Sequence, residues 1–286
     1  MMADFTLSED IVQIIQRALA EDIGDGDITT QSTVPEELWL EGHFVARAEG
    51  IIAGLEVARM VFTLLDERVE LQPFVTDGQA VSPLMQLAKV HGPGRALLTG
   101  ERTALNLVQR ISGIATSTRS YVQAVRGTKA VILDTRKTAP GLRALDKLGV
   151  RLGGGQNHRA GLYDMALIKN NHIAAVGGDL AEAVRCVRQG DSRHRPVEIE
   201  VRSLDELQQA LVLDVDRILL DNMSYDQLRQ AVTLTDGRVP LEASGGVTLD
   251  TVVEIARTGV DYISVGALTH SVKALDISLW IETIDR

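Results

Sequence analysis

Hydrophobic and polar positions follow a repeating unit along the second half of the chain. From Ala130 onward, each apolar run of strand length ends in polar residues or glycine and precedes a segment of helical periodicity. The six runs are AVILDTRK, MALIKNNH, PVEIEVRS, RILLDNMS, PLEASGGV and YISVGALT. Strands that alternate with helices are parallel. The pattern therefore predicts an α/β unit, either a closed six-stranded barrel or an open doubly wound sheet.

The segments between these runs carry apolar residues every three or four positions, as in LAEAVRCVRQG and LDTVVEIARTG. Two helix starts are explicit in the sequence. Ser203 with Glu206 and Ser224 with Gln227 fit the capping box, in which each side chain bonds the other residue's free main-chain N–H.

The part of the chain before Ala130 has a different pattern. Short strand-like runs mix with helical periodicity and turn glycines, which indicates a smaller α+β domain. Residues 101–126 fit one long helix with a regular apolar stripe. We expect this helix to bridge the two domains, so the domain boundary should fall within it.

Composition narrows the class of protein. The chain has 286 residues, enough for a core that needs no disulfide or metal, and its net charge of −10 argues against a protein that binds nucleic acid or an anionic membrane. Cys186, the single cysteine, falls in an apolar pattern and is expected in the core. Neither a signal peptide nor a membrane span is recognisable, so we expect a cytoplasmic protein with a small-molecule partner.

Polar residues and glycines gather at the ends of all six apolar runs. Ligands of α/β barrels and open α/β sheets bind at the carboxyl ends of the strands, where the loops converge. The residues at these ends are Arg136 and Lys137; Lys169, Asn170, Asn171 and His172; Glu198 and Glu200; Asp221 and Asn222; Ser244, Gly245 and Gly246; and Gly266. Six ends with this character indicate a ligand site rather than ordinary surface polarity.

Positive charge is concentrated between Arg136 and His172. This segment has seven lysines or arginines and two acids, a local charge of +5 within a chain of −10. The guanidinium group binds carboxylate and phosphate through a planar fork of donors. Arg136 and Arg159, together with Lys137, Lys169 and His158, could therefore hold a substrate with several anionic groups; the alternative is a surface cluster of charges.

Carboxylates and glycines supply the other half of the pattern. In VEIEV, Glu198 and Glu200 share one strand face, and inward carboxylates at this depth need lysines, ligand hydroxyls or a hard cation such as Mg²⁺. The alternative is an exposed edge strand with salt bridges. ASGGV, with Ser244 to Gly246 before a helical segment, and the nearby Gly266 offer main-chain N–H groups to a phosphate.

Seven segments together resemble the quinolinate phosphoribosyltransferase family, in the family's order. They are GERTALNLVQRISGIAT, LDTRKTAPGLR, GGGQNHRAGLYDMALIKNNHI, VEIEV, LLDNM, EASGGV and SVGALTHS. The resemblance implies a six-stranded α/β barrel at 113–270 and an N-terminal α+β domain at 1–112 that is completed by about 271–286. It also implies a homodimer in which the barrel of one subunit and the N-terminal domain of the other share each active site.

The resemblance implies roles for individual residues. Arg136, His158 and Arg159 would bind the two carboxylates of quinolinate, together with Arg102 of the partner subunit. The four catalytic positions would be Lys137 and Lys169 on the phosphates and substrate, and Glu200 and Asp221 on the ribose hydroxyls and Mg²⁺. The 5-phosphate of phosphoribosyl pyrophosphate would contact Ser244, Gly245, Gly246 and Gly266.

Two other functions are compatible with this pattern. A paralogue on the same scaffold would transfer the phosphoribosyl group to another acceptor. A non-catalytic barrel protein would bind phosphoribosyl pyrophosphate without releasing pyrophosphate, although such a protein would not need the full set of acids and cations.

Overall fold

A computed structural model describes residues 7–283 and divides the chain into two compact units. The first unit comprises Met1–Arg119, Ala139–Gly154 and Ser271–Arg286, and the second comprises Ser120–Thr138 and Gly155–His270. The helix predicted at 101–126 is α4, Gly94–Ala124, which begins earlier than expected and contains the boundary between the units.

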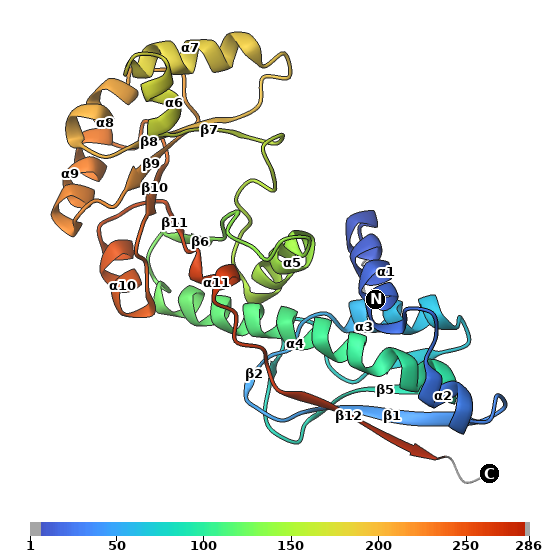
Figure 1. Ribbon diagram of the computed structural model, residues 1–286. Coiled ribbons are helices and arrows are strands. Elements are labelled where there is room, and N and C mark those ends of the chain that lie inside the picture. The colour runs from blue at the N-terminus through green and yellow to red at the C-terminus, as the bar shows by residue number, and fades with distance from the viewer. Residues whose placement is uncertain (1–6, 284–286) are drawn as a thin grey trace. The chain divides into compact units, whose positions relative to one another are not determined.

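The first unit is an α+β structure (Figure 1). Its antiparallel sheet has the order β12-β1-β5-β3, and a two-stranded sheet pairs β2 with β4. The strands are β1 (Trp39–Ala46), β2 (Gly50–Ile51), β3 (Glu70–Pro73), β4 (Ala80–Val81), β5 (Gln86–Pro93) and β12 (Ile277–Thr283). The helices, besides most of α4, are α1 (Glu9–Ile23), α2 (Ile28–Thr33), α3 (Leu55–Leu65) and α5 (Arg143–Gly153).

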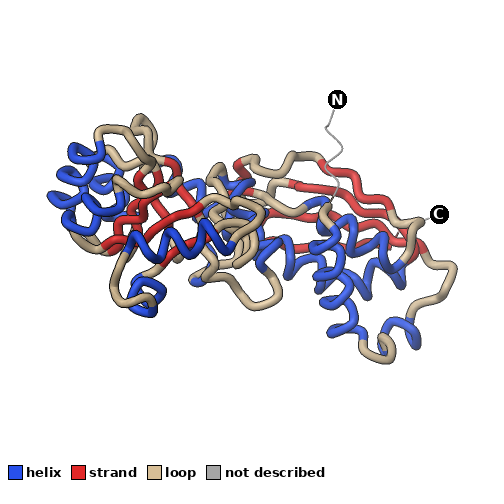
Figure 2. Tube along the Cα trace, turned by 90° about the horizontal axis from the view of Figure 1, so that it is seen from above, coloured by secondary structure: helices blue, strands red, loops and turns tan. Residues whose placement is uncertain are grey.

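One face of the four-stranded sheet carries the core of the first unit. Figure 2 shows the blue helices of this unit gathered on one side of its red strands. Phe44 of β1 and Phe62 of α3 are fully buried and meet edge to face, with ring centroids 6.3 Å apart. The last strand along the chain, β12, pairs with β1, so residues from both ends of the sequence share this sheet. The predicted C-terminal segment extends to 286, and its residues 284–286 lie outside the described part.

The second unit contains the parallel six-stranded sheet predicted from the repeating pattern. Its strand order is β6-β11-β10-β9-β8-β7, and Figure 1 shows the strands following one another in an arc. Each strand falls within one of the six apolar runs: β6 (Val131–Leu133), β7 (Ala166–Ile168), β8 (Val197–Val201), β9 (Arg217–Asp221), β10 (Leu241–Ser244) and β11 (Tyr262–Ser264). Among residues 7–283, no ladder pairs β6 with β7 to close a barrel.

The helices of the second unit are α6 (Asn170–Ala175), α7 (Leu180–Gly190), α8 (Leu204–Ala210), α9 (Tyr225–Thr235), α10 (Leu249–Arg257) and α11 (Ala267–His270). Ser224 and Gln227 form the predicted capping box at α9. The capping box predicted for α8 is only half correct. The Ser203 hydroxyl accepts from the Glu206 N–H. The Glu206 carboxylate, however, accepts from the N–H of Arg202 rather than from that of Ser203.

Two expectations about burial have different outcomes. All five residues of β8 are buried between β7 and β9, which excludes an exposed edge strand for Glu198 and Glu200. The expectation of a core position for Cys186 is wrong. The residue is exposed on α7, and its thiol donates to the Glu182 carboxylate. The buried stripe of α7 consists of Leu180, Ala183 and Val184.

The connection between β6 and β7 departs from the strand–helix repeat. Its helix, α5, belongs to the first unit and packs on α4, where a Cβ at Gly153 would lie 2.6 Å from the carbonyl oxygen of Ala115. The compact units therefore differ from the two domains expected at 1–112 and 113–270, and residues 139–154 belong to the first unit. Gln156 then pairs with Leu133 along the edge of β6.

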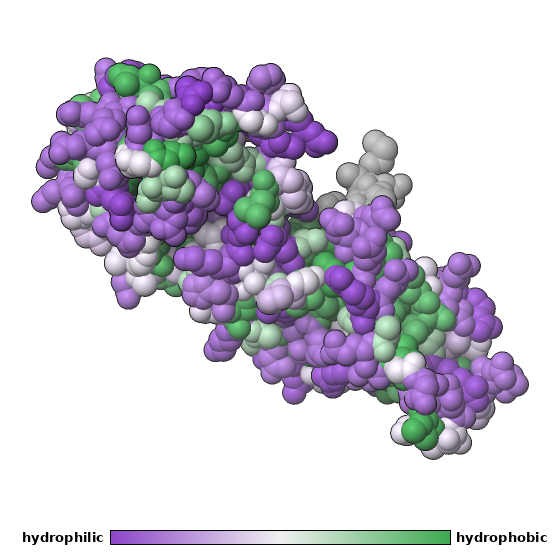
Figure 3. Space-filling model, turned by 45° about the horizontal axis from the view of Figure 1, so that its top comes forward, coloured by the Kyte–Doolittle hydropathy of each residue, from purple (hydrophilic) through white to green (hydrophobic). Residues whose placement is uncertain are grey.

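The surface in Figure 3 is mostly hydrophilic, with hydrophobic side chains in small groups. The large hydrophobic residues that are most exposed include Leu162 and Tyr163, in the loop before β7. No helix in the described part of the chain is long and apolar enough to span a bilayer.

Candidate active site

A cavity of about 410 Å³ opens at the carboxyl ends of the six parallel strands. Ten of the twelve predicted site residues line it: Arg136, Lys137, His158, Arg159, Lys169, Glu200, Asp221, Ser244, Gly245 and Gly246. Gly266 lies directly beside it, since a Cβ there would be 3.1 Å from Cδ of Lys137. Arg102 is not a lining residue; it is exposed on α4 in the first unit.

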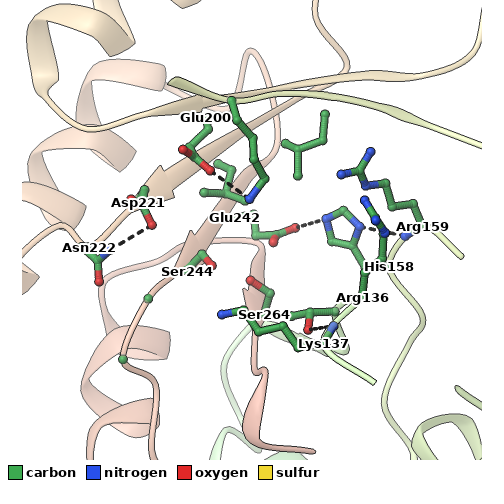
Figure 4. A pocket seen from close by; sticks show the side chains of 16 residues that line it. Arg136, Lys137, His158, Arg159, Glu200, Asp221, Asn222, Glu242, Ser244 and Ser264 are labelled. Carbon is green, nitrogen blue, oxygen red and sulfur yellow. Dashed lines mark hydrogen bonds and ion pairs between the residues drawn. The ribbon is translucent and has the colours of Figure 1, made fainter. Parts of the chain in front are cut away.

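Two arginines and two strand-end carboxylates occupy different sides of this cavity. Figure 4 shows Glu200 and Asp221 on one side and Arg136 and Arg159 on the other, with His158 and Glu242 between them. The carboxylates come from the neighbouring strands β8 and β9. The arginines come from the loop after β6 and from the loop that precedes β7. The cavity can therefore hold a ligand that is anionic at one end and hydroxylated or metal-bound at the other.

The loops that carry the cations are fixed by buried hydrogen bonds. Asp134, fully buried at the end of β6, accepts from the His158 N–H at 2.8 Å and from Asn157 Nδ2 at 2.6 Å. The carbonyl oxygen of Lys137 accepts from Thr269 Oγ1 at 2.8 Å, and its N–H donates to Thr135 Oγ1 at 3.0 Å. Both cation-bearing segments are thus held by contacts that leave their side chains directed at the cavity.

The two arginines are close enough to disfavour each other's charge. Burial and the neighbouring charge of Arg136 lower the pKa of Arg159 from its usual value. Arginine stays protonated at any physiological pH, so the two charges repel each other throughout this range. An anion placed between the two guanidinium groups would relieve it.

A buried ion network lies beneath the cations. His158 Nε2 is 2.9 Å from the Glu198 carboxylate and 3.3 Å from that of Glu242, and both glutamates are fully buried. Arg217 donates to Glu242 at 3.0 Å and stacks on the Tyr262 ring. Two carboxylates that are removed from water are thus balanced by two cationic side chains.

The titration of His158 reflects this network. Burial by itself lowers the pKa of the imidazole, but hydrogen bonds and charges from Glu198 and Glu242 outweigh burial and raise it from 6.5 to about 9. The Arg159 N–H donates to Nδ1 at 2.7 Å and favours the neutral ring. Two buried carboxylates have a stronger effect than one amide dipole, so we expect the charged form at neutral pH, in which Nδ1 carries a proton and no longer accepts from Arg159. For Glu198 itself, burial raises the carboxyl pKa.

His158, Glu198 and Glu242 also satisfy the distance criterion for a metal site, with one ligand atom each within 4.8 Å of the others. One oxygen of Glu242, Oε2, is already bonded to Arg217. Arg217 and protonated His158 neutralise both carboxylates, which makes this cluster better suited to an ion network than to a cation. Glu200 and Asp221 are the more suitable metal ligands, because both face the open cavity.

Glycines form the remaining wall of the cavity. Gly245 and Gly246, between β10 and α10, have φ angles of +103° and +60°, a backbone conformation that side chains rarely adopt. The residues precede Thr248, the N-cap of the nine-residue helix α10. Main-chain N–H groups near a helix start favour an anion such as a phosphate.

The structure adds lining residues that the predicted set lacked: Thr135, Leu167, Leu219, Asn222, Glu242 and Ser264. A signal for Glu242 was present, because it precedes Ser244 by two residues and so shares its strand face. Asn222 directly follows Asp221 at a strand end. The two leucines carry no such signal, since apolar lining residues look like core residues in the sequence.

Models of the quinolinate phosphoribosyl transferase N-terminal and C-terminal domains match residues 27–112 and 114–280. A nicotinate-nucleotide pyrophosphorylase [carboxylating] of Mycobacterium leprae is 51% identical over 274 residues, covering 93% of this chain and 95% of that protein. A probable nicotinate-nucleotide pyrophosphorylase [carboxylating] of Bacillus subtilis is 46% identical over 267 residues, with 93% and 92% covered. The crystal structure of NadC from Streptococcus pyogenes superposes with a TM-score of 0.93 at 38% identity, covering 99% and 100%.

We predict that His158 titrates far above an ordinary histidine. Its ring-proton NMR signals, assigned by their loss in a His158→Gln variant, should titrate near pH 9 in the wild type and nearer 6.5 in Glu198→Gln. The pKa of His158 is higher in the folded than in the unfolded protein, so its protonation stabilises the fold by about 3 kcal/mol. This stabilisation is complete below pH 6.5 and is lost as pH rises towards 9. A wild-type midpoint at or below 6.5 would contradict the ion network.

Proposed function

This chain belongs to the quinolinate phosphoribosyltransferase family, and we propose that the cavity on its six-stranded sheet is the site at which it performs the family's reaction. The enzyme transfers the phosphoribosyl group of phosphoribosyl pyrophosphate to quinolinate, with loss of pyrophosphate and CO₂, and forms nicotinate mononucleotide for NAD biosynthesis. The observation that supports this site is that Arg136 and Arg159 lie on one side of the cavity and the Glu200 and Asp221 carboxylates on the other.

The cationic side is suited to a planar dianion. Arg136 and Arg159 repel each other until two carboxylates lie between them, and each guanidinium can bind one carboxylate through two parallel hydrogen bonds. His158, protonated at neutral pH, adds positive charge from below. Lys137 and Lys169 would neutralise the phosphates, because a lysine ammonium on a flexible stem serves as a mobile point charge.

The carboxylate side is suited to ribose and Mg²⁺. Glu200 and Asp221 offer hard oxygen ligands, and Mg²⁺ typically binds one or two carboxylates together with substrate phosphates. Lys169, 3.4 Å from Glu200, restrains that carboxylate while leaving half of its own side chain exposed. When bound, Mg²⁺ would supply positive charge to the departing pyrophosphate.

The charge distribution matches the chemistry of the transfer step. Displacement of pyrophosphate from ribose C1 builds positive charge on the sugar and negative charge on the leaving group. Glu200 and Asp221 would stabilise the first from positions that their strands fix before the reaction begins, and Lys137 and Lys169 would stabilise the second. No protein nucleophile is needed, because the ring nitrogen of quinolinate attacks the sugar directly.

Decarboxylation then requires mainly orientation. The mononucleotide formed in the first step has a positively charged ring nitrogen next to the carbon that loses CO₂, and this charge stabilises the resulting carbanion. Arg136 and Arg159 would hold the dianion in the geometry needed for both steps.

We also propose a homodimer with shared active sites, in which Arg102 of one subunit completes the anion site of the other. Arg102 is exposed on α4 and forms no hydrogen bond or ion pair with the described residues. Closure of the six-stranded sheet into a barrel and a cytoplasmic location also remain predictions. The pairing of Gln156 with the free edge of β6 supports closure, because it extends the arc of strands towards β7.

The number of cations predicts discrimination against a monocarboxylic acid. Nicotinic acid would leave one arginine in the cavity without a carboxylate, so kcat/KM should fall at least about 100-fold relative to quinolinate. Two assays test this prediction. One measures ¹⁴CO₂ from carboxyl-labelled quinolinate, and the other compares the pyrophosphate released from phosphoribosyl pyrophosphate with each acid. Comparable turnover of the two acids would overturn the assignment of the cavity.

The carboxylate side predicts that Glu200→Gln loses turnover rather than quinolinate binding. We expect kcat to fall about 100-fold, because charge stabilisation of the sugar is lost, while the Kd for quinolinate measured by calorimetry changes little. Activity should also disappear with chelator and return with Mg²⁺. Glu254→Gln, in an exposed pair on α10, is the matched control and should keep full activity. Chelator-resistant activity would contradict the metal proposal.

The shared site predicts complementation between two inactive variants. Arg102→Ala and Lys169→Ala should each be nearly inactive, but in a mixed dimer both lesions fall in one site and leave the other intact. Random exchange makes half the dimers mixed, so an equimolar co-refolded sample should regain roughly a quarter of wild-type activity. No recovery, with mixed dimers verified by native mass spectrometry, would place Arg102 outside the partner's site.

A further inference from the structure

Asn222 has an uncommon backbone conformation at the point where β9 enters the cavity. Its φ is +54°, in the left-handed region where a residue other than glycine is rare, although asparagine tolerates it better than most. Its N–H donates to the carbonyl oxygen of Ser244 at 2.9 Å, which extends the pairing of β9 with β10 by one residue. The turn therefore directs the Asn222 side chain into the space between the ends of two strands.

One side of the Asn222 carboxamide contacts Asp221. Nδ2 donates to Oδ1 of Asp221 at 3.0 Å, and Figure 4 shows the two side chains facing each other at the cavity wall. No other hydrogen bond to the Asp221 carboxylate is formed by residues 7–283. Asn222 thus fixes one carboxylate oxygen and leaves the second available to a ligand.

The other side of the carboxamide lies against Gly245. A Cβ at Gly245 would be 2.1 Å from Oδ1 and 2.5 Å from Cγ of Asn222, closer than any real contact. Gly245 also has a φ of +103°. The carboxamide therefore occupies the space that a side chain at position 245 would need, and it packs directly against the Gly245 backbone.

We propose that Asn222 is a positioning residue that holds the Asp221 carboxylate and the Gly245–Gly246 turn at the spacing of a single phosphoribosyl group. This inference rests on the proposed function, in which Asp221 serves the ribose and metal end and the glycine turn serves the 5-phosphate. The ribose 5-phosphate is a short, nearly rigid unit, so two contacts at its ends strengthen each other only if their separation is set before binding.

A simpler explanation is that asparagine is present only because the turn needs a left-handed residue. The chain provides a matched control for this explanation. Asp236, after α9, has a φ of +49° and donates its N–H to Val232 at 3.1 Å, but it does not line the cavity. Glycine at either position relaxes the backbone, whereas only Asn222→Gly removes a side chain from between Asp221 and Gly245.

Calorimetric binding to the full-length protein, with Mg²⁺ present, separates the two explanations. In Asn222→Gly we expect the Kd for phosphoribosyl pyrophosphate to rise about tenfold, the typical effect of losing a hydrogen bond to a charged group. The Kd for quinolinate should stay within about twofold, and the melting temperature should not fall, because glycine suits the turn. Asp236→Gly should leave both dissociation constants unchanged.

A second variant controls for the added backbone flexibility that glycine introduces at position 222. Asn222→Asp keeps the size and the turn preference of the side chain but replaces the donor to Asp221 with a like charge, so it should weaken phosphoribosyl pyrophosphate binding at least as much. Wild-type affinity in both folded variants, or equal losses for both substrates, would overturn the inference. Failure of the wild type to bind phosphoribosyl pyrophosphate would instead overturn the proposed function on which it rests.

Discussion

The charge balance of the buried ion network constrains the rest of the site. Glu198 and Glu242 are fully buried on strands β8 and β10, and a buried carboxylate without a cation is strongly unfavourable. Arg217 neutralises one charge, and His158 supplies the second from a loop rather than from a strand. Removing one partner of such a pair typically costs about 3–5 kcal/mol, so the loop that carries His158 is held firmly to the sheet.

The placement of His158 determines the placement of the arginines. Arg159 is the next residue, so the ion network that holds His158 also fixes the start of the Arg159 side chain. Its guanidinium lies close enough to Arg136 for the two charges to repel each other. In the proposed function, the folded protein carries this repulsion before the substrate binds, and a dianion would relieve it. Affinity and specificity for two carboxylates would then have a common physical origin.

Much of this organisation could be predicted from the sequence, because it depends on local periodicity. The alternation of apolar runs and helical segments identified all six parallel strands. The polar residues and glycines at their ends, with His158 and Arg159 of the cation-rich segment, supplied the ten predicted site residues that line the cavity. The expectations failed where tertiary packing, rather than local periodicity, determines the structure. Cys186 fits an apolar stripe but lies off the buried face of α7, and α5 follows β6 in sequence yet packs on α4. Asn222 was recognised at a strand end but given no role, and Glu242 was missed because a lone glutamate in a strand is common on protein surfaces.

The departure of α5 from the sheet explains why the cations can reach the cavity. In a regular repeat, a strand would pair with the free edge of β6 and direct alternate side chains away from the site. Here residues 155–157 cover that edge: the N–H of Gln156 donates to Ile132, and that of Asp134 donates to Gln156. Asp134 then accepts from His158 on the returning segment. Irregular backbone leaves His158 and Arg159, two consecutive residues, free to serve the site together, which strand alternation would forbid. The irregular segment at the edge of β6 is therefore the feature that lets two consecutive cationic side chains join those at the strand ends.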